Sequence, residues 1–277
     1  MKALVGTFAV SLALAACAVS VDETSLIPAL EQPAADVRLV TPEGYIQSEA
    51  LFPIDGLGVV HAVRLDRVDT DAVMLFAGGS GHFTARSSRR LARLAALTDA
   101  DIVTFDYPGR SGTTLPATAG ALVQLGPALV AEFRAAGWIG SGPVYAYGFS
   151  FGGASASNFA RTGGFSGLIL ESTSSDIVAM GRNMIPAVVR PLVRLEVDED
   201  LAAFDYFRFA TESRAPILLL AARDDAQADL ATVTAFAERL RGAGANVSIV
   251  ETPGRHGDAI YSDEAAAAIG ALFASAQ

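Results

Sequence analysis

The chain of 277 residues contains a single cysteine, Cys17, which excludes an internal disulfide and a zinc site built from clustered cysteines. Lysine is also scarce, because Lys2 is the only one and the other 19 basic residues are arginines. Thirty acidic residues give a net charge of -10, which argues against a nucleic-acid partner. Only 18% of the residues are charged and 51% are hydrophobic, so the composition excludes a disordered chain and provides for a large core.

The N-terminus carries a pattern typical of exported proteins. Lys2 precedes an apolar run, residues 3–16, which has the length of a signal-peptide core and is too short to span a membrane. Residues 14–17 read Leu-Ala-Ala-Cys, which resembles the lipobox of bacterial lipoproteins. The resemblance implies that residues 1–16 are removed, that Cys17 is lipidated, and that the protein is anchored to a membrane of the bacterial cell envelope. The alternative is an ordinary signal peptide cleaved near Ala16, with an incidental cysteine.

The remainder divides into an N-terminal arm and one domain. Residues 17–55 are polar and contain four prolines, which indicates a tether or surface arm, and residues 56–277 form the predicted domain. Short apolar runs predict strands near 59–65, 72–76, 102–105, 144–147, 168–170, 217–221 and 247–250. Helical periodicity predicts helices near 86–97, 117–136, 152–161, 228–243 and 263–275. This alternation predicts a doubly wound α/β fold with a mostly parallel sheet flanked by helices.

A candidate nucleophile follows the predicted strand at 144–147. Residues 148–152 read Gly-Phe-Ser-Phe-Gly and match the pattern G-x-S-x-G of a nucleophile elbow, with Ser150 at its centre. A serine between strand and helix must occupy a strained turn, and glycines two residues away on either side let the two elements approach. The apolar strand before the motif and the small residues after it favour this interpretation over a glycine-rich turn with a capping serine.

With the elbow in place, the chain resembles the α/β-hydrolase family across residues 58–275. The shared landmarks are the glycine loop at 76–81, the segment Asp-Tyr-Pro-Gly-Arg-Ser at 106–111, the elbow, the aspartates after strand 217–221, and the loop Pro-Gly-Arg-His-Gly-Asp at 253–258. The resemblance is greatest to short-lid serine hydrolases of the BEM46-like or serine aminopeptidase-like branch. Two features depart from the family pattern: Ala77 stands where a histidine is usual, and the Asp106 segment lacks one glycine-containing step.

A serine nucleophile needs a base and a group that orients the base. Of the three histidines, only His256 follows both the serine and the candidate acids in the chain order that the fold requires, so His256 is the predicted base. His61 is interpreted as a structural or surface residue. His82, in the glycine loop, either contacts substrate or plays an ordinary loop role.

The family pattern, counted from Pro216, implies that Asp225 is the triad acid. The neighbouring Asp224 and the more distant Asp229 stay open as alternatives, and Asp258 is interpreted as a carboxylate of a loop or helix start.

The tetrahedral intermediate needs two N–H donors. The backbone N–H groups of Phe151 and Gly79 are predicted to form this oxyanion hole. A phosphate cradle is a poor alternative for the glycine loop, since no Gly-Lys-Ser/Thr follows it.

Residues 174–213 lie outside the core pattern and are predicted to form a small helical lid, the alternative being ordinary packing on the core. Its apolar and aromatic residues favour an uncharged acyl group, and Arg182, Arg190 and Arg194 lie either on its outer face or against an anionic substrate.

The sequence therefore predicts a serine hydrolase that acts on a small-molecule ester or thioester, without a metal or organic cofactor. A peptidase, an acyl transferase and a non-catalytic envelope-binding lipoprotein are the alternatives.

Overall fold

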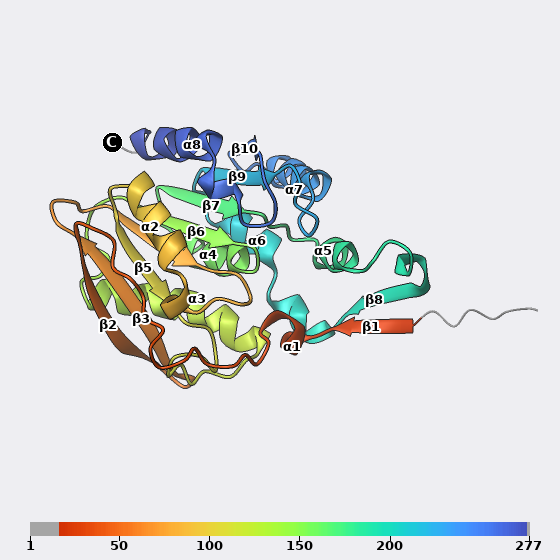
Figure 1. The fold of residues 1–277 in the computed structure, drawn as a ribbon, viewed down its shortest axis with the longest axis horizontal. Helices are drawn as coiled ribbons and strands as arrows, with labels where there is room; N and C mark the ends of the chain where they lie inside the picture. Colours follow the sequence, from red (N-terminus) through yellow and green to blue (C-terminus); the bar gives the residue numbers. More distant parts are fainter. Residues whose placement is uncertain (1–16, 276–277) are drawn as a thin grey trace, which may run out of the picture.

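The computed structural model describes residues 17–275, and its centre is an eight-stranded sheet (Figure 1). In spatial order the strands are β10 (Val247–Thr252), β9 (Ile217–Ala222), β7 (Gly167–Glu171), β6 (Val144–Phe149), β4 (Val73–Ala77), β5 (Asp101–Phe105), β3 (Gly58–Arg67) and β2 (Tyr45–Ile54). The six strands from β10 to β5 are parallel, whereas β3 is antiparallel to both of its neighbours. The carboxyl ends of the parallel strands therefore meet along one edge.

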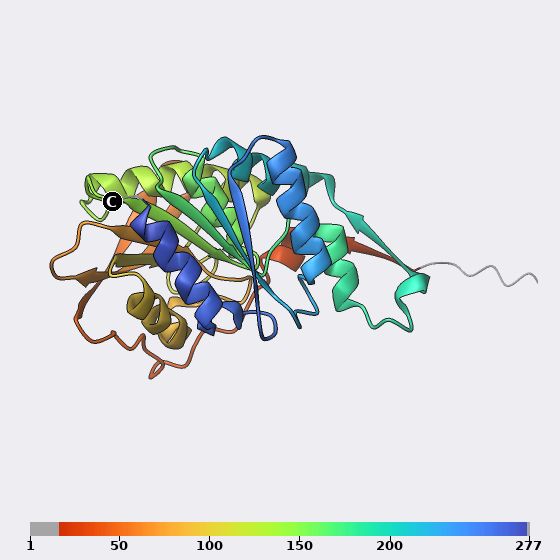
Figure 2. The ribbon, with the colours of Figure 1, turned by 90° about the horizontal axis from the view of Figure 1, so that it is seen from above.

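Helices cover both faces of this sheet, as Figure 2 shows. One face packs against α3 (Ala119–Ala135), α4 (Gly152–Ala160) and α7 (Leu230–Gly242), and the other against α2 (Ser88–Leu97) and α8 (Asp263–Ala274). Strand β4 illustrates the two cores: Leu75 belongs to the first and Phe76 to the second. Because neighbouring side chains point to opposite faces, a strand buried on both faces is apolar throughout.

The predicted fold class is confirmed, and each predicted strand and helix is present with small shifts at its ends. The boundary at residue 56 is wrong, because β2 lies at the edge of the main sheet and buries Tyr45, Phe52 and Ile54. Its sequence alternates between buried and exposed positions, and Pro53 is tolerated because β2 has a neighbour on one side only.

The segment before β2 also departs from a free tether. Gln32 donates to the carbonyl of Gly109 at 2.7 Å and accepts from the N–H of Ser111 at 3.1 Å, while Ile27 is buried. These contacts hold the segment against the body as a surface arm. The predicted signal peptide, residues 1–16, lies outside the described residues, and lipidation of Cys17 stays a prediction.

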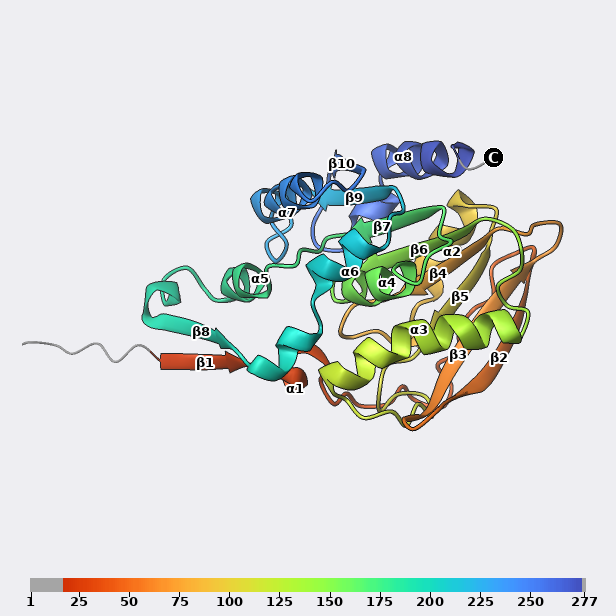
Figure 3. The same cartoon turned by 180° about the vertical axis from the view of Figure 1, so that it is seen from behind.

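A second, two-stranded sheet lies beyond the carboxyl ends of the parallel strands. It pairs β1 (Cys17–Val21) with β8 (Val193–Val197) in parallel, and it projects from the body together with α5 (Ile177–Met184) (Figures 1 and 3). The short α1 (Glu23–Leu26) and a 3-10 turn, Glu199–Ala203, connect this extension to the body. Within residues 17–275, no helix combines the length and the apolar character needed to cross a membrane.

The predicted helical lid is therefore only partly correct. The region includes strand β8, which pairs with a segment distant in sequence. Its last helix, α6 (Tyr206–Glu212), packs on α4 and buries Phe209 in the core, as the alternative of ordinary packing expects.

Candidate active site

Ser150 lies at the sharp turn between β6 and α4. Its φ of +53° is in the left-handed region, which is unfavourable for a residue with a side chain. The turn is held by hydrogen bonds from the N–H of Ser150 to the carbonyl of Glu171 and from the N–H of Gly153 to the carbonyl of Ser150, both 2.9 Å long. A Cβ atom at Gly152 would collide with the backbone of Ala77. The glycines of the motif are therefore a steric requirement of this turn.

His256 reaches Ser150 from the other end of the chain. Its Nε2 lies 3.0 Å from the Ser150 Oγ, and its Nδ1 lies 2.9 Å and 3.1 Å from the two carboxylate oxygens of Asp225. Asp225 follows β9 and His256 follows β10, which are adjacent parallel strands. With the proton on Nδ1, the imidazole donates to Asp225 and accepts from the Ser150 hydroxyl.

The carboxylate of Asp225 is buried and well supplied with donors. The N–H groups of Gln227 and Ala228 donate to its Oδ1 at 2.8 Å and 2.9 Å. Burial raises the pKa of this carboxyl, but the hydrogen bond and charge of His256 and these two N–H groups outweigh burial, so the pKa lies below its usual value of 3.8. Asp225 is therefore ionised at neutral pH and favours a proton on the Nδ1 of His256.

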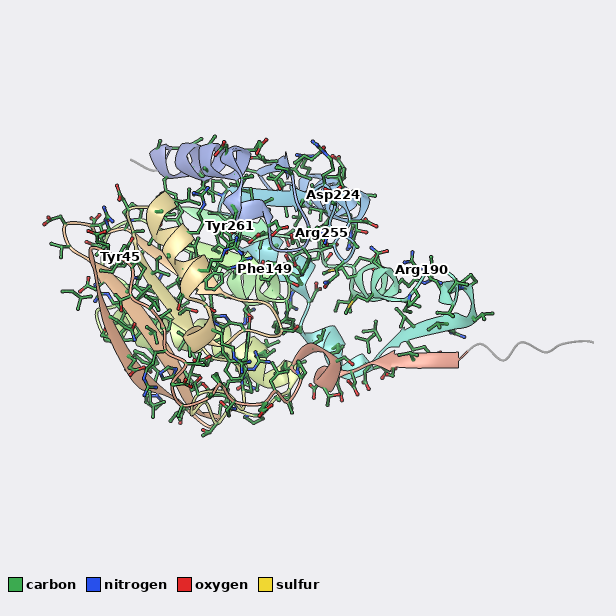
Figure 4. The ribbon with its side chains drawn as sticks, viewed as in Figure 1. Tyr45, Phe149, Arg190, Asp224, Arg255 and Tyr261 are labelled. Atoms are coloured by element: carbon green, nitrogen blue, oxygen red, sulfur yellow. The ribbon has the colours of Figure 1, made fainter. Side chains whose placement is uncertain are left out.

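The other candidate acids have different roles. Asp224 is exposed, Asp229 caps α7 through the N–H of Thr232 at 2.7 Å, and Asp258 accepts from the N–H of Arg255 at 2.9 Å. Figure 4 labels Asp224 and Arg255 in the two neighbouring loops that carry Asp225 and His256. Of the four aspartates considered, the structure brings only Asp225 to the imidazole.

The two predicted oxyanion donors flank the serine. Phe151 follows it directly, and a Cβ built on Gly79 would lie 3.5 Å from the Ser150 Cβ, so the glycine loop runs beside the nucleophile. In the described part of the chain, the N–H groups of Phe151 and Gly79 donate to no protein acceptor. Both donors are thus free for a ligand oxygen.

Two side chains of the segment after β5 hold the glycine loop in place. The Tyr107 hydroxyl donates to the carbonyl of Gly78 at 2.8 Å, and the buried Arg110 guanidinium donates to the carbonyl of His82 at 2.7 Å and to that of Ser80. No role was predicted for either residue from the sequence. The one available signal was their place in the landmark segment 106–111, in which the structure buries both charged residues, Asp106 and Arg110.

A second support, also missed, holds the loop that carries His256. Arg90 of α2 forms an ion pair with the fully buried Glu171, donates to the carbonyl of Gly257 at 2.7 Å, and lies 4.1 Å from the centre of the Phe149 ring. The Tyr147 hydroxyl donates to the same carboxylate at 2.7 Å. Because Gly257 follows His256 and Phe149 precedes Ser150, this network connects the loop of His256 to the turn at Ser150.

The remaining histidines lie away from Ser150. His82 is buried between the hydroxyls of Ser87 at 3.0 Å and Thr104 at 3.2 Å, and burial lowers its pKa to about 4. His82 is therefore a neutral loop residue. His61 of β3 contacts Asp106 and Glu49, as its structural interpretation expects. Within residues 17–275, no three His, Cys, Asp or Glu side chains are grouped so that they could hold a metal ion.

Comparisons with known proteins agree with this fold. A family model described as "Alpha/beta hydrolase family" matches residues 74–253, which include the elbow and Asp225. A search of curated protein sequences finds no match.

Several solved structures share the fold. An esterase from Pyrococcus furiosus has a TM-score of 0.66 at 15% identity, and the match covers 88% of this chain and 99% of that one. Carboxyl esterase 2 from the fungus Tuber melanosporum has a TM-score of 0.62 at 17% identity, covering 88% and 93%. A thermostable esterase from Pseudomonas putida has a TM-score of 0.60 at 18% identity, covering 88% and 86%. At these identities the similarity concerns the fold.

Proposed function

This chain belongs to the alpha/beta hydrolase family, and from that membership we propose that it is a serine hydrolase that cleaves an ester or thioester. The observation that carries the proposal is the continuous hydrogen-bond chain from Asp225 through His256 to Ser150. A buried carboxylate, an imidazole and a hydroxyl in this order can activate the hydroxyl at neutral pH. The esterases with the same fold support an ester as the substrate, in the coarse sense that their scaffold accommodates this chemistry.

In the proposed reaction, the Ser150 oxygen attacks the substrate carbonyl carbon while His256 Nε2 takes the hydroxyl proton. Asp225 stabilises the imidazolium that forms. The imidazolium then gives its proton to the leaving alcohol or thiol, and the bond to the leaving group breaks. Water, deprotonated by His256, next attacks the acyl-enzyme, and the proton returns to Ser150 as the acid leaves.

The N–H groups of Phe151 and Gly79 stabilise the oxyanion of both tetrahedral intermediates in this proposal. Each donor of this kind contributes about 3–4 kcal/mol of transition-state stabilisation. Tyr107 and Arg110 act through the loop, because they hold its carbonyls and so aim its N–H groups. They are positioning residues.

The side chains beside the nucleophile favour an uncharged acyl group. Phe151 is half-buried, and its ring centre lies 5.4 Å from that of Tyr107 and 5.9 Å from that of Phe204. Aromatic faces of this kind bind apolar groups through dispersion and loss of water contact. We therefore expect acyl chains without charge near the carbonyl to be preferred.

The second part of the proposal concerns location. The leader at 1–16 and the Leu-Ala-Ala-Cys sequence support a lipid anchor on Cys17 and a place in the bacterial cell envelope. Mass spectrometry of the N-terminal peptide tests this: diacylglycerol on Cys17 supports the anchor, and an unmodified Cys17 or a different N-terminus contradicts it.

Labelling with a fluorophosphonate probe tests the catalytic proposal. We expect the wild-type protein to be labelled and Ser150→Ala to be unlabelled, while Ser155→Ala, the matched hydroxyl deletion in α4, stays labelled. Wild-type protein that remains folded but unlabelled would contradict the proposal. Product analysis by mass spectrometry on esters, thioesters and peptides, with and without an added alcohol acceptor, then separates an esterase from a peptidase or an acyl transferase.

A further inference from the structure

The end of the extension is the most apolar exposed region of the described chain. We name residues 177–195 the tip; they comprise α5, the 3-10 turn Arg190–Leu192 and the first residues of β8. Val188 is 84% exposed and Met184 is 69% exposed, and α5 buries none of its residues. Val189 and Leu192 are exposed as well. So many exposed apolar side chains in one projecting segment indicate a surface that binds a membrane or another molecule.

The charge of the tip is opposite to that of the protein. It contains Arg182, Arg190 and Arg194 and no acidic residue, whereas the whole chain has a net charge of -10. Arg194 lies 3.2 Å from the carboxylate of Glu196, just beyond the tip, but both side chains are exposed and such a pair is weak. Arg182 and Arg194 are exposed, and Arg190, which donates to the carbonyls of Ile185 and Asn183, lies apart from Phe149 in Figure 4. Exposed arginines with apolar side chains among them form the pattern of segments that lie in the interface of anionic bilayers.

The pairing of β1 with β8 connects the tip to the N-terminus. Cys17 is in register with Val193, so the backbone of Cys17 lies beside the tip. The predominantly apolar run 3–16 precedes it directly in the sequence. A lipid on Cys17, or the apolar leader itself before cleavage, would therefore bring a membrane to the tip before any other part of the molecule.

We propose that the tip docks into the interface of an anionic phospholipid bilayer, with its exposed apolar side chains among the acyl chains and Arg182 and Arg194 against the phosphates. The argument from Cys17 rests on the proposed anchor, whereas the exposure and charge of the tip do not. A bilayer is favoured over a second copy of the chain because Cys17 lies beside the tip, so the proposed anchor would place a membrane, and not another protein, next to it.

A single fluorescent label tests docking without the anchor. In a Cys17→Ser background that begins at residue 17, so that neither the leader nor a lipid is present, Val188→Cys is the only thiol and is labelled with an environment-sensitive nitrobenzoxadiazole dye. The matched control is Val68→Cys in the same background, because Val68 is 65% exposed and directly follows β3, a strand that Figure 1 shows on the side of the body away from the extension. Phosphatidylcholine vesicles with about one-third phosphatidylglycerol should shift the emission of the first label to the blue and leave the second unchanged.

Charge provides the second arm of the test. Each basic residue near an anionic surface strengthens binding about fivefold, so Arg182→Gln with Arg194→Gln should weaken vesicle binding about 25-fold. The protein with the unaltered tip should show a similar loss of binding when vesicles of phosphatidylcholine alone replace the anionic vesicles. Fluorophosphonate labelling of every variant verifies that the fold and the nucleophile are intact.

Three results would overturn docking: an unshifted label at Val188, equal shifts at Val188 and Val68, or a shift that depends on protein concentration and not on vesicles, which would indicate a second copy. These failures are distinct from a failure of the anchor, which the mass of the N-terminal peptide of the wild-type protein reports separately.

Discussion

Two histidine–aspartate pairs in this molecule have nearly the same local geometry and opposite prospects for catalysis. His256 places Nδ1 2.9 Å from Asp225, and His61 places Nδ1 2.8 Å from Asp106. Both carboxylates are fully buried and both imidazoles are 17–18% exposed. Each aspartate also accepts from backbone N–H groups, Asp225 from Gln227 and Ala228 and Asp106 from Thr84.

The pairs differ in what the second ring nitrogen contacts. Nε2 of His256 faces the hydroxyl of Ser150 at 3.0 Å, whereas Nε2 of His61 faces the carboxylate of Glu49 at 3.2 Å. Asp106 and then Glu49 raise the pKa of His61 against the opposing effect of burial, so that this imidazole holds its proton to a higher pH than a free imidazole. Two carboxylates favour the protonated form of an imidazole, while an imidazole between a carboxylate and a hydroxyl can act as a base.

The largest expected effect separates the two histidines directly. His256→Ala should lower kcat/KM for p-nitrophenyl acetate by about a millionfold, since the nucleophile loses its base. His61→Ala should change it by less than about tenfold, because His61 contacts no reacting group. Steady-state kinetics on both variants makes the comparison, and similar losses for the two would show that His61 takes part in the reaction.

Substitution of the paired aspartates, Asp225 and Asp106, should affect activity in the same unequal way as substitution of the two histidines, but by a smaller factor. Asp225→Asn should lower kcat about ten-thousandfold, because an amide favours the wrong imidazole tautomer and cannot stabilise the imidazolium. Asp106→Asn should instead lower the free energy of unfolding, by about 3 kcal/mol, with a far smaller loss of kcat. Steady-state kinetics and urea unfolding measure the two effects. A larger loss of kcat in Asp106→Asn than in Asp225→Asn would contradict the prediction.

A third difference is how each imidazole is held. His61 lies on a strand, whereas His256 lies on a loop that Arg90 anchors through the carbonyl of Gly257. Arg90→Leu should lower kcat about a hundredfold through misplacement of the base, with little change in KM. It should also destabilise the fold by about 3–5 kcal/mol, because the carboxylate of Glu171 loses its partner.

The double variant Arg90→Leu with Glu171→Gln separates these two effects. Removal of the buried charge should restore much of the stability, while the low kcat persists because Gly257 still lacks its donor. Arg90→Lys should recover part of kcat. Full recovery of kcat in the double variant would reduce Arg90 to a stabilising residue with no role in positioning the base.

The smallest expected effect is a pH dependence of stability at His61. Because the folded-state pKa lies above the ordinary 6.5, His61 contributes stability that is complete below about pH 6.5 and is lost as the pH rises through the folded-state pKa. The difference in unfolding free energy between the wild type and His61→Gln should therefore shrink as the pH rises above about 6.5. Urea unfolding across this pH range measures it, and a difference that grows with pH would contradict the raised pKa.

Much of the scaffold could be predicted from the sequence because its signals are local. A parallel strand buried on both faces must be apolar throughout, so the runs that became β4, β6 and β9 were readable without a structure. The elbow was readable because steric contact admits only glycine at Gly148 and Gly152. Strand β2 was not, because an edge strand with a solvated face tolerates Glu49 and Pro53 and resembles a polar arm.

The prediction of a helical lid at residues 174–213 was only partly correct for a different reason. Strand β8 pairs with β1, whose residues lie more than 170 positions earlier in the chain, and neither segment has a strong strand signal alone. Pairing over such a distance depends on where the rest of the fold places both segments. No local pattern reports that placement.

By itself, the sequence determined the order of strands and helices, the strained turn at Ser150 and the chain order of the serine, the aspartates and the histidine. The family resemblance implied Asp225 but left Asp224 open, and the tertiary structure decided that Asp225 faces the imidazole and that Arg90 and Glu171 support it. The physical reason is that residue type specifies what a side chain can do. Which partner it meets depends on the packing of β9 beside β10 and of α2 against the loop at Gly257, over distances that no local pattern encodes.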